Sequence, residues 1–250
     1  MFSPVSIIAH RGASEQTPEN TISAINLALE LQADYVEIDV RVSKEGIPVV
    51  LHDPSAARMI GAASSPPIDE LALLQIQQID IGRLFGKAFV GEKIPTLMEV
   101  LNLNWNQTGL MIEIKECSER PEILVSKIFN VISNIKKTPP DIIFGSFSPD
   151  IIREVQRQSP MLNSPIKTIG IVEEPDLLHP FLEQGLKHLA LWYKIVTPEL
   201  MRSLKEKEIC VWTFTVDDFN VAHFLISLGI SGIITNIPKK MKENCFFNLH

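Results

Sequence analysis

The stretch YVEIDV, residues Tyr35–Val40, alternates charged and apolar side chains. Because successive side chains of a β-strand point to opposite faces, Glu37 and Asp39 share one face, and valine and isoleucine take the other. Charged groups at every second position of a core strand are costly unless a cation, an anion or water accompanies them. The stretch therefore predicts a strand with one face in a hydrophobic core and the other at a polar site.

Similar β-rich runs recur along the chain, and a helix-like stretch follows most of them. The predicted barrel strands are Ser6–His10, Tyr35–Val40, Leu110–Lys115, Ile142–Phe147, Lys167–Ile171, His188–Trp192, Ile209–Phe214 and Gly232–Thr235. Repeated strand–helix units in a chain of 250 residues favour a closed parallel (β/α)8 barrel, the TIM barrel, over an open doubly wound sheet. We therefore expect one α/β domain, residues 1–250, with its site at the carboxyl ends of the strands.

Four short motifs predict where helices begin. Thr17-Pro18-Glu19, Ser148-Pro149-Asp150 and Thr197-Pro198-Glu199 each offer a capping hydroxyl, a proline at the first position and an early acid. Asp217-Asp218 offers carboxylates for the same purpose. We expect helices to start at these positions.

The segment after the second strand predicts a β-hairpin. Glu45-Gly46 suits a two-residue turn between two strand-like runs. Such a turn pairs Lys44 with Ile47, and the same register continued inward sets Asp39 opposite His52. The hairpin would thus return a histidine to the polar face of the second strand.

Residues from about 41 to 93 form an insertion in the regular strand–helix repeat. After the hairpin, Ala56–Pro67 is small, polar and ends in proline, which is typical of a loose rim. Ile68–Ile79 has helical spacing and predicts a small covering helix. A functional lid and an inert surface excursion both fit this pattern.

Residues that could act as acids, bases or ligands gather at the ends of the first three barrel strands and on the hairpin beside them. They are His10, Arg11, Glu37, Asp39, His52, Glu113 and Lys115. Taken singly, each has an ordinary alternative, such as a core histidine or a solvated strand face. Together they are hard to attribute to chance. Three carboxylates without cysteine ligands favour a hard divalent cation, Mg²⁺ or Ca²⁺, and leave the histidines free for proton transfer.

Composition limits the classes of partner. The formal net charge of −7 and the pI near 5.4 argue against nucleic acid or an anionic membrane as the general partner. No run approaches the ~20 apolar residues of a membrane span, and Met1–Ala9 lacks the features of a secretory signal. We therefore expect a cytoplasmic protein without stable membrane insertion; the sequence gives no indication of its oligomeric state.

A set of short motifs covers nearly the whole chain: His10-Arg11-Gly12, Pro18–Thr21, Glu37-x-Asp39, Pro48–Asp53, Ile94–Leu101, Ile112–Lys115, Val211–Thr213 and Gly229–Thr235. Together they resemble the glycerophosphodiester phosphodiesterase family. Two positions depart from the pattern of many relatives, since Asn236 stands in place of aspartate and Thr215 in place of asparagine. These departures concern the details of the substrate pocket.

The resemblance implies a phosphoinositide-phospholipase-like barrel with assigned roles for the clustered residues. It implies a metal at Glu37, Asp39 and Glu113, catalytic histidines at His10 and His52, and phosphate contacts at Arg11 and Lys115. Further candidates for the substrate pocket are Glu19, Phe147 and Trp212. Asn20 is a further residue that could line the site mouth. The alternatives are a place in the first turn of a helix for Glu19 and Asn20, and a place as a packed strand aromatic for Trp212.

The expected reaction is metal-dependent hydrolysis of small glycerophosphodiesters to glycerol 3-phosphate and an alcohol. By resemblance it proceeds through a cyclic phosphate, with the two histidines as acid and base in an order that the sequence leaves open. Two alternatives remain at this stage: a lysophospholipase D-like hydrolase, and a non-catalytic barrel that binds a phosphorylated ligand.

Overall fold

The computed structural model describes residues 5–135, 138–162 and 166–247, and these form a closed parallel barrel. The barrel strands are β1 (Ser6–His10), β2 (Tyr35–Val42), β4 (Gly109–Ile114), β5 (Ile142–Ser146), β6 (Lys167–Val172), β7 (His188–Trp192), β8 (Cys210–Phe214) and β9 (Gly232–Thr235). Closure comes from β1, which pairs in parallel with both β2 and β9. The expected (β/α)8 barrel is confirmed.

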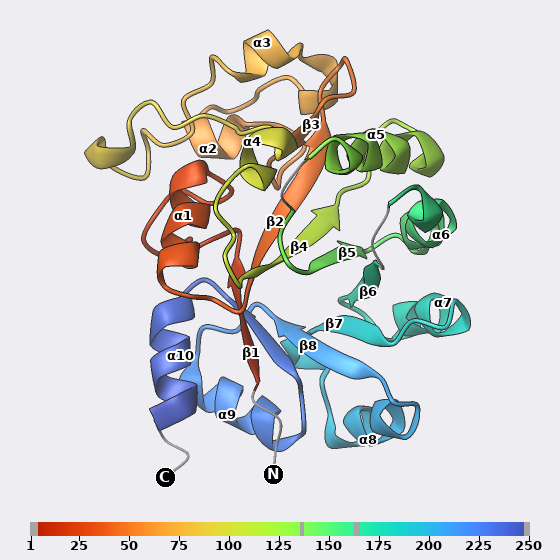
Figure 1. Cartoon of the computed structure of the whole chain (residues 1–250). Helices are drawn as coiled ribbons and strands as arrows, with labels where there is room; N and C mark the ends of the chain where they lie inside the picture. Colours follow the sequence, from red (N-terminus) through yellow and green to blue (C-terminus); the bar gives the residue numbers. More distant parts are fainter. Residues whose placement is uncertain (1–4, 136–137, 163–165, 248–250) are drawn as a thin grey trace.

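Helices surround the barrel and fill the connections between its strands (Figure 1). They are α1 (Ile22–Glu30), α2 (Ala57–Ile60), α3 (Leu73–Ile76), α4 (Leu97–Leu101), α5 (Pro121–Ser133), α6 (Pro149–Gln158), α7 (Leu178–Glu183), α8 (Pro198–Glu206), α9 (Phe219–Ser227) and α10 (Pro238–Phe247). Short 3₁₀ helices are η1 (Ile68–Glu70), η2 (Lys87–Phe89), η3 (Ser159–Met161), η4 (Pro175–Leu177) and η5 (Tyr193–Ile195). In the part of the chain that is described, no helix has the length and apolar character needed to cross a membrane.

The two faces of β2 have the different environments that its alternating sequence predicts. Val36, Ile38 and Val40 are fully buried in an apolar cluster together with residues of α1, such as Ile25. A separate cluster is formed by side chains from other positions of the barrel strands: Ile8, Met111, Ile143, Ile169, Ile171, Ala190, Trp212 and Ile234. The acidic side chains of β2 therefore face away from the helices.

Three of the four predicted helix starts are confirmed, and one is wrong. Helices α6, α8 and α9 begin directly after their expected capping residues Ser148, Thr197 and Asp218. Helix α1 begins later than expected, because its cap is Thr21, whose hydroxyl accepts from the backbone N–H of Ala24 at 3.1 Å. The segment before Thr21 is thereby left as a loop that can reach the site.

The predicted two-residue turn is also wrong, and the hairpin register differs from the expected one by one residue. Strand β3 (Pro48–Val50) pairs antiparallel with β2, and the backbone N–H of Ser43 donates to the carbonyl of Ile47. Three residues, 44–46, therefore connect the strands, with only Gly46 in the left-handed region at φ +78°. A two-residue type I′ turn needs φ > 0 at both of its central residues, which is costly at Glu45.

This register sets Leu51 opposite Asp39, and the Leu51 N–H donates to the Asp39 carbonyl at 3.0 Å. His52 lies one residue further along the chain. It still comes to the barrel mouth, but as part of the loop after β3.

The segment between the hairpin and α4 has a small hydrophobic core of its own. Its members are Val49, Leu51, Ala56, Ile68, Ile76, Ile81 and Ile94. The single helix expected over Ile68–Ile79 is replaced by η1 and α3, because Leu71 is extended and its carbonyl accepts from the Lys44 N–H at 2.9 Å. This segment packs beside β2 and β3 at one side of the barrel (Figure 1).

Candidate active site

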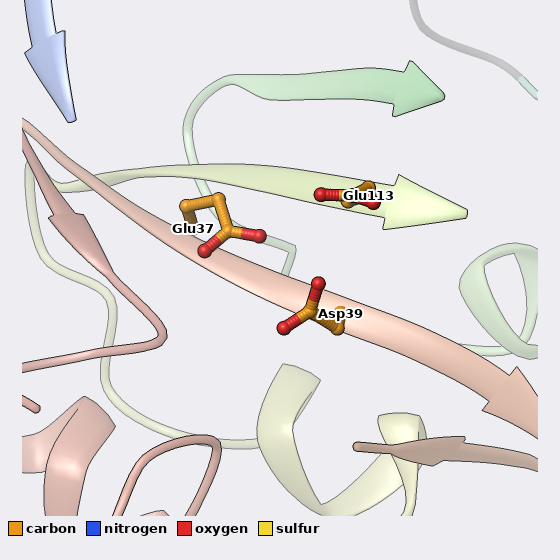
Figure 2. Close-up of side chains that lie close together, drawn as sticks. All are labelled: Glu37, Asp39 and Glu113. Carbon is orange, nitrogen blue, oxygen red and sulfur yellow. The ribbon is translucent and has the colours of Figure 1, made fainter. Parts of the chain in front are cut away.

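Two neighbouring strands bring three carboxylates together. Glu37 and Asp39 come from β2, and Glu113 from β4, where it lies directly beside Asp39 in the parallel register. Figure 2 shows the three side chains grouped over these strands. One ligand oxygen from each lies within 4.8 Å of the others, and all three residues are buried. We call Glu37, Asp39 and Glu113 the carboxylate cluster.

Burial and mutual repulsion perturb the carboxylate cluster. Burial, and then the neighbouring Asp39, raise the pKa of Glu37 well above its usual range and that of Glu113 to about 7. Burial also opposes ionisation of Asp39, but Lys115 and Arg11 hold the pKa of that carboxyl below its ordinary value.

The oxygen Oε1 of Glu37 is buried and accepts no hydrogen bond from any residue that the structure describes. Buried polar atoms normally have a partner. A cation bound at this site would supply the partner that Oε1 lacks. Three grouped carboxylates with such an oxygen fit a hard divalent cation, whose preferred ligands are oxygen atoms.

Two basic side chains lie against the carboxylate cluster. Lys115 Nζ is 2.9 Å from Asp39 Oδ1 and also forms an ion pair with Glu113. Arg11 Nε is 3.2 Å from Asp39 Oδ2, and the Arg11 backbone N–H donates to Glu37 at 2.9 Å. Both basic side chains are mostly buried, and the site therefore joins positive charge to a carboxylate cluster.

A sharp backbone turn after β1 sets the position of Arg11. Both Arg11 and Gly12 have positive φ, at +56° and +85°. A Cβ on Gly12 would lie 2.6 Å from the backbone of Ala24 in α1, so only glycine allows this close approach. The strand thus ends in a turn packed against α1, with Arg11 directed at the carboxylates.

Asn20 contacts the carboxylate cluster and lies before the first turn of α1, whose cap is Thr21. Its side-chain N–H donates to Asp39 Oδ2 at 2.7 Å, and its carbonyl oxygen accepts from the Asp39 backbone N–H at 3.2 Å. Asn20 is fully buried, with φ +59°, a conformation that asparagine tolerates better than most residues.

His10, the last residue of β1, is held by a neighbour from the opposite end of the sequence. Its Nδ1 is 2.7 Å from Oδ1 of Asn236, whose amide N–H donates to Asp217 at 2.7 Å. Because Asp217 fixes the amide orientation, Oδ1 faces the ring and His10 must donate through Nδ1. Burial, and then Arg11, lower the pKa of His10 to about 4, so the ring is neutral and Nε2 can accept a proton.

His52 has a different kind of partner. Its Nδ1 lies 2.7 Å from Oδ1 of Asp53, and Arg41 donates two hydrogen bonds to its backbone carbonyl. Burial lowers the pKa of His52, but a carboxylate next to Nδ1 opposes that effect. Both candidate histidines therefore have Nδ1 engaged, one with an amide oxygen and one with a carboxylate.

The aromatic candidates separate into two places. Phe147 follows β5, with its ring 5.7 Å from Lys115 Nζ and 6.0 Å from the ring of Phe214. Trp212 instead is buried, 5.0 Å from Tyr35 at the start of β2. The structure brings Phe147 to the basic side of the site, and Trp212 occupies the packed position that was its alternative.

Glu19 lies at the site, although not in the first turn of a helix. Its Oε1 accepts from Arg11 Nη1 at 2.9 Å, and both of its oxygens accept from Arg58. Arg58 was not predicted, because it lies in a segment whose sequence indicated only a loose rim. Asp53 could have been found from its place directly after His52.

Comparison with known proteins gives one consistent result. Residues 10–240 match the model of the glycerophosphoryl diester phosphodiesterase family. A glycerophosphodiester phosphodiesterase of Caldanaerobacter subterraneus subsp. tengcongensis is 33% identical over 241 residues, which cover 94% of this chain and 95% of that protein.

Solved structures agree with the sequence relatives. A phosphodiesterase of Oleispira antarctica, in complex with the product sn-glycerol-3-phosphate, has a TM-score of 0.87 and 26% identity, with 96% of each chain covered. A glycerophosphodiester phosphodiesterase of Thermotoga maritima has a TM-score of 0.75 and 25% identity, with 97% of this chain and 99% of that one covered. The chain therefore belongs to the glycerophosphoryl diester phosphodiesterase family and is an enzyme of that family.

Proposed function

We propose that this enzyme hydrolyses small glycerophosphodiesters to glycerol 3-phosphate and an alcohol, with the carboxylate cluster as the site of one divalent cation, Mg²⁺ or Ca²⁺. The observation that carries the proposal is the carboxylate cluster itself, buried beside two cationic side chains at strands β2 and β4. The relative that is solved with sn-glycerol-3-phosphate supports the choice of product.

The cation-binding assignment follows from the donor set. Glu37, Asp39 and Glu113 offer only oxygen ligands, and burial disfavours their ionised forms unless positive charge is added. When bound, the cation would neutralise charge that develops on the phosphoryl oxygens. Its identity is a matter for measurement.

Arg11 and Lys115 are the residues that we assign to the phosphate group. Their side chains reach the carboxylate cluster from directly after two different strands, β1 and β4, so an anion placed beside the cluster would meet both. Arg11 offers two or more N–H donors in one plane, and Lys115 offers a point charge. Both stabilise an increase of negative charge during displacement.

His10 and His52 are the proposed proton carriers. His10 is neutral and backed by an amide, which suits a group that first accepts the proton of the glycerol 2-hydroxyl. The Asp53 carboxylate beside Nδ1 of His52 partly offsets the lowering of its pKa by burial, which suits a group that delivers a proton to the leaving alkoxide. The phosphorus–oxygen bond to the alcohol breaks as the 2-hydroxyl oxygen attacks.

The resulting cyclic phosphate is opened by water, and the two histidines exchange roles in that step. His52 then accepts the proton of water, and His10 returns its proton to the 2-hydroxyl oxygen. Each transfer of this kind typically contributes ~10²–10⁴-fold to the rate. Phe147 remains a candidate wall of the pocket through its position beside Lys115.

The test is release of glycerol 3-phosphate from glycerophosphocholine and glycerophosphoethanolamine, and of lysophosphatidic acid from lysophosphatidylcholine. We expect faster release from the two water-soluble substrates, loss of activity with a chelator, and recovery with Mg²⁺ or Ca²⁺. His10→Ala and His52→Ala should each lower kcat by at least about a hundredfold. His179→Ala is the control, because that side chain is 76% exposed.

Three results would count against parts of this proposal. Preference for lysophosphatidylcholine would make the enzyme lysophospholipase D-like. Full activity after thorough chelation would show that the reaction needs no divalent cation. No glycerol 3-phosphate from any substrate would reject the reaction itself.

A further inference from the structure

We propose that Arg58, in helix α2 of the segment after the hairpin, is a positioning residue that holds His52 and Arg11 in one arrangement. It acts through two carboxylates, Asp53 and Glu19. This inference rests on the proposed function, since it concerns the same site, but it assigns a role to a residue outside the clustered motifs.

All three nitrogens of the Arg58 guanidinium are engaged. Nε donates to Asp53 Oδ2 at 2.6 Å, while Nη1 and Nη2 donate to the two oxygens of Glu19 at 3.1 and 2.7 Å. The pairing with Glu19 has the parallel, forked geometry in which arginine is most specific. One side chain thus fixes two carboxylates that come from separate loops.

Each of these carboxylates also contacts a residue to which we assign a part in the reaction. Asp53 Oδ1 lies 2.7 Å from Nδ1 of His52, and Glu19 Oε1 accepts from Arg11 Nη1 at 2.9 Å. Arg58 therefore stands one carboxylate away from the proposed proton donor and one away from the proposed phosphate-binding arginine. It touches neither of them in the contacts of the described residues.

Arg58 also supplies positive charge to the two carboxylates that it contacts. Burial would raise the pKa of both carboxyls, but hydrogen bonds from Arg58 contribute to holding the pKa of Glu19 and of Asp53 below their usual values. Without that cation the two carboxylates would face each other with less compensation. Asp53 would then be free to turn away from the His52 ring.

The position of Arg58 is set by the small core of its own segment. Ala56, two residues earlier, is fully buried in the cluster that also contains Leu51, the residue before His52. The same core therefore supports both ends of the Asp53–Arg58 pair. The part of the segment that carries Asp53 and Arg58 is therefore held in place beside the site.

The decisive comparison is Arg58→Met against Arg83→Met. Arg83 lies in the same segment and pairs with one carboxylate, Asp80, which is not a residue of the site, and its side chain is 72% exposed. We expect Arg58→Met to lower kcat about tenfold to a hundredfold, because a small misplacement of catalytic groups costs that much. KM should rise as well, because Arg11 loses the support that reaches it through Glu19, whereas Arg83→Met should leave both constants unchanged.

A double-mutant cycle tests the route through Asp53. If Arg58 acts by holding Asp53, the combined loss in Arg58→Met/Asp53→Asn should be clearly smaller than the product of the two single losses. The ¹⁵N shifts of the His52 ring provide a readout that does not depend on turnover. We expect the signature of a proton on Nδ1 in the wild type and a mixed tautomer in Arg58→Met.

The thermal unfolding midpoint checks that each variant is folded. If Arg58→Met does not fold, Arg58→Lys replaces it in the comparison. Lysine keeps the charge but cannot reproduce the fork, so a lowered kcat with a normal midpoint supports the proposal. A kcat equal to that of Arg83→Met, unchanged His52 ring shifts, or losses that multiply in the cycle would each overturn it. Absence of wild-type turnover would reject the proposed function instead, and the ring shifts would still test Arg58.

Discussion

Oδ1 of Asn236 lies 2.7 Å from Nδ1 of His10, and this contact joins the end of the first barrel strand to the residue directly after the last one. A neutral amide at this position orients the ring without adding negative charge. The pKa of His10, already lowered by burial and then by Arg11, can therefore stay at about 4. The ring remains neutral over the whole range in which a general base must work.

The variant Asn236→Asp should change the pH dependence in one direction. A carboxylate beside Nδ1 stabilises the imidazolium, so the pKa of His10 should rise. Since the base must be neutral, the acid limb of kcat/KM should move to higher pH, from below the ordinary histidine value of 6.5 toward it. Asn236→Ala is the comparison; it should lower kcat without an upward shift. An unchanged or downward-shifted limb in Asn236→Asp would contradict the proposed role of His10.

Replacing Glu37 by glutamine should have opposite effects on cation binding and on the stability of the metal-free protein. The carboxylate cluster packs three acids against two basic groups, so removing one buried charge relieves repulsion. In chelator, we expect Glu37→Gln to raise the free energy of unfolding by roughly 1–3 kcal/mol, measured by chemical denaturation.

The same variant should bind Mg²⁺ or Ca²⁺ at least about tenfold more weakly by calorimetry, because one oxygen ligand loses its charge. Asp150→Asn is a control, since that carboxylate is 68% exposed and pairs with Arg153, outside the carboxylate cluster. Equal affinity in Glu37→Gln and wild type would remove Glu37 from the ligand set.

Gly12→Ala should lower the free energy of unfolding more than Gly185→Ala, although both glycines have positive φ. The added Cβ would lie 2.6 Å from the backbone of Ala24, whereas a Cβ at Gly185, with φ +72°, meets no atom within 4 Å. We expect a loss of about 1 kcal/mol for Gly185→Ala, from the backbone conformation alone. Gly12→Ala should lose about 2–4 kcal/mol, because the clash adds to that cost.

Activity separates the two glycine variants as well. The turn at Gly12 positions Arg11, so Gly12→Ala should raise KM and lower kcat even at temperatures where the protein is fully folded. Gly185→Ala should retain wild-type constants. Equal stability losses in the two variants would show that the loop after β1 can move away from α1 at little cost.

The barrel and the carboxylate cluster could be predicted from the sequence because both depend on strand periodicity. Alternation on β2 put Glu37 and Asp39 on one face, and the parallel register then brought Glu113 beside Asp39. Neither step requires knowledge of loop conformation. A strand's polar face can therefore be predicted residue by residue.

Contacts that depend on loops were beyond such reasoning. The hairpin register failed because a third residue entered the turn before Gly46, which sequence spacing does not distinguish from a two-residue turn. For Asn20 the sequence left a site position and a helix-start position open, because the later helix cap, Thr21, was not predicted. Arg58 reaches Glu19 only through the tertiary packing of a segment with little regular structure.

The pairing of β1 with β9 has a consequence for how the site forms during folding. The carboxylate cluster and His52 lie between residues 37 and 113, but Asn236 is 226 residues after His10 in the sequence. His10 gains this partner only when β9 pairs with β1. Closure of the barrel and orientation of the proposed proton acceptor are therefore one event.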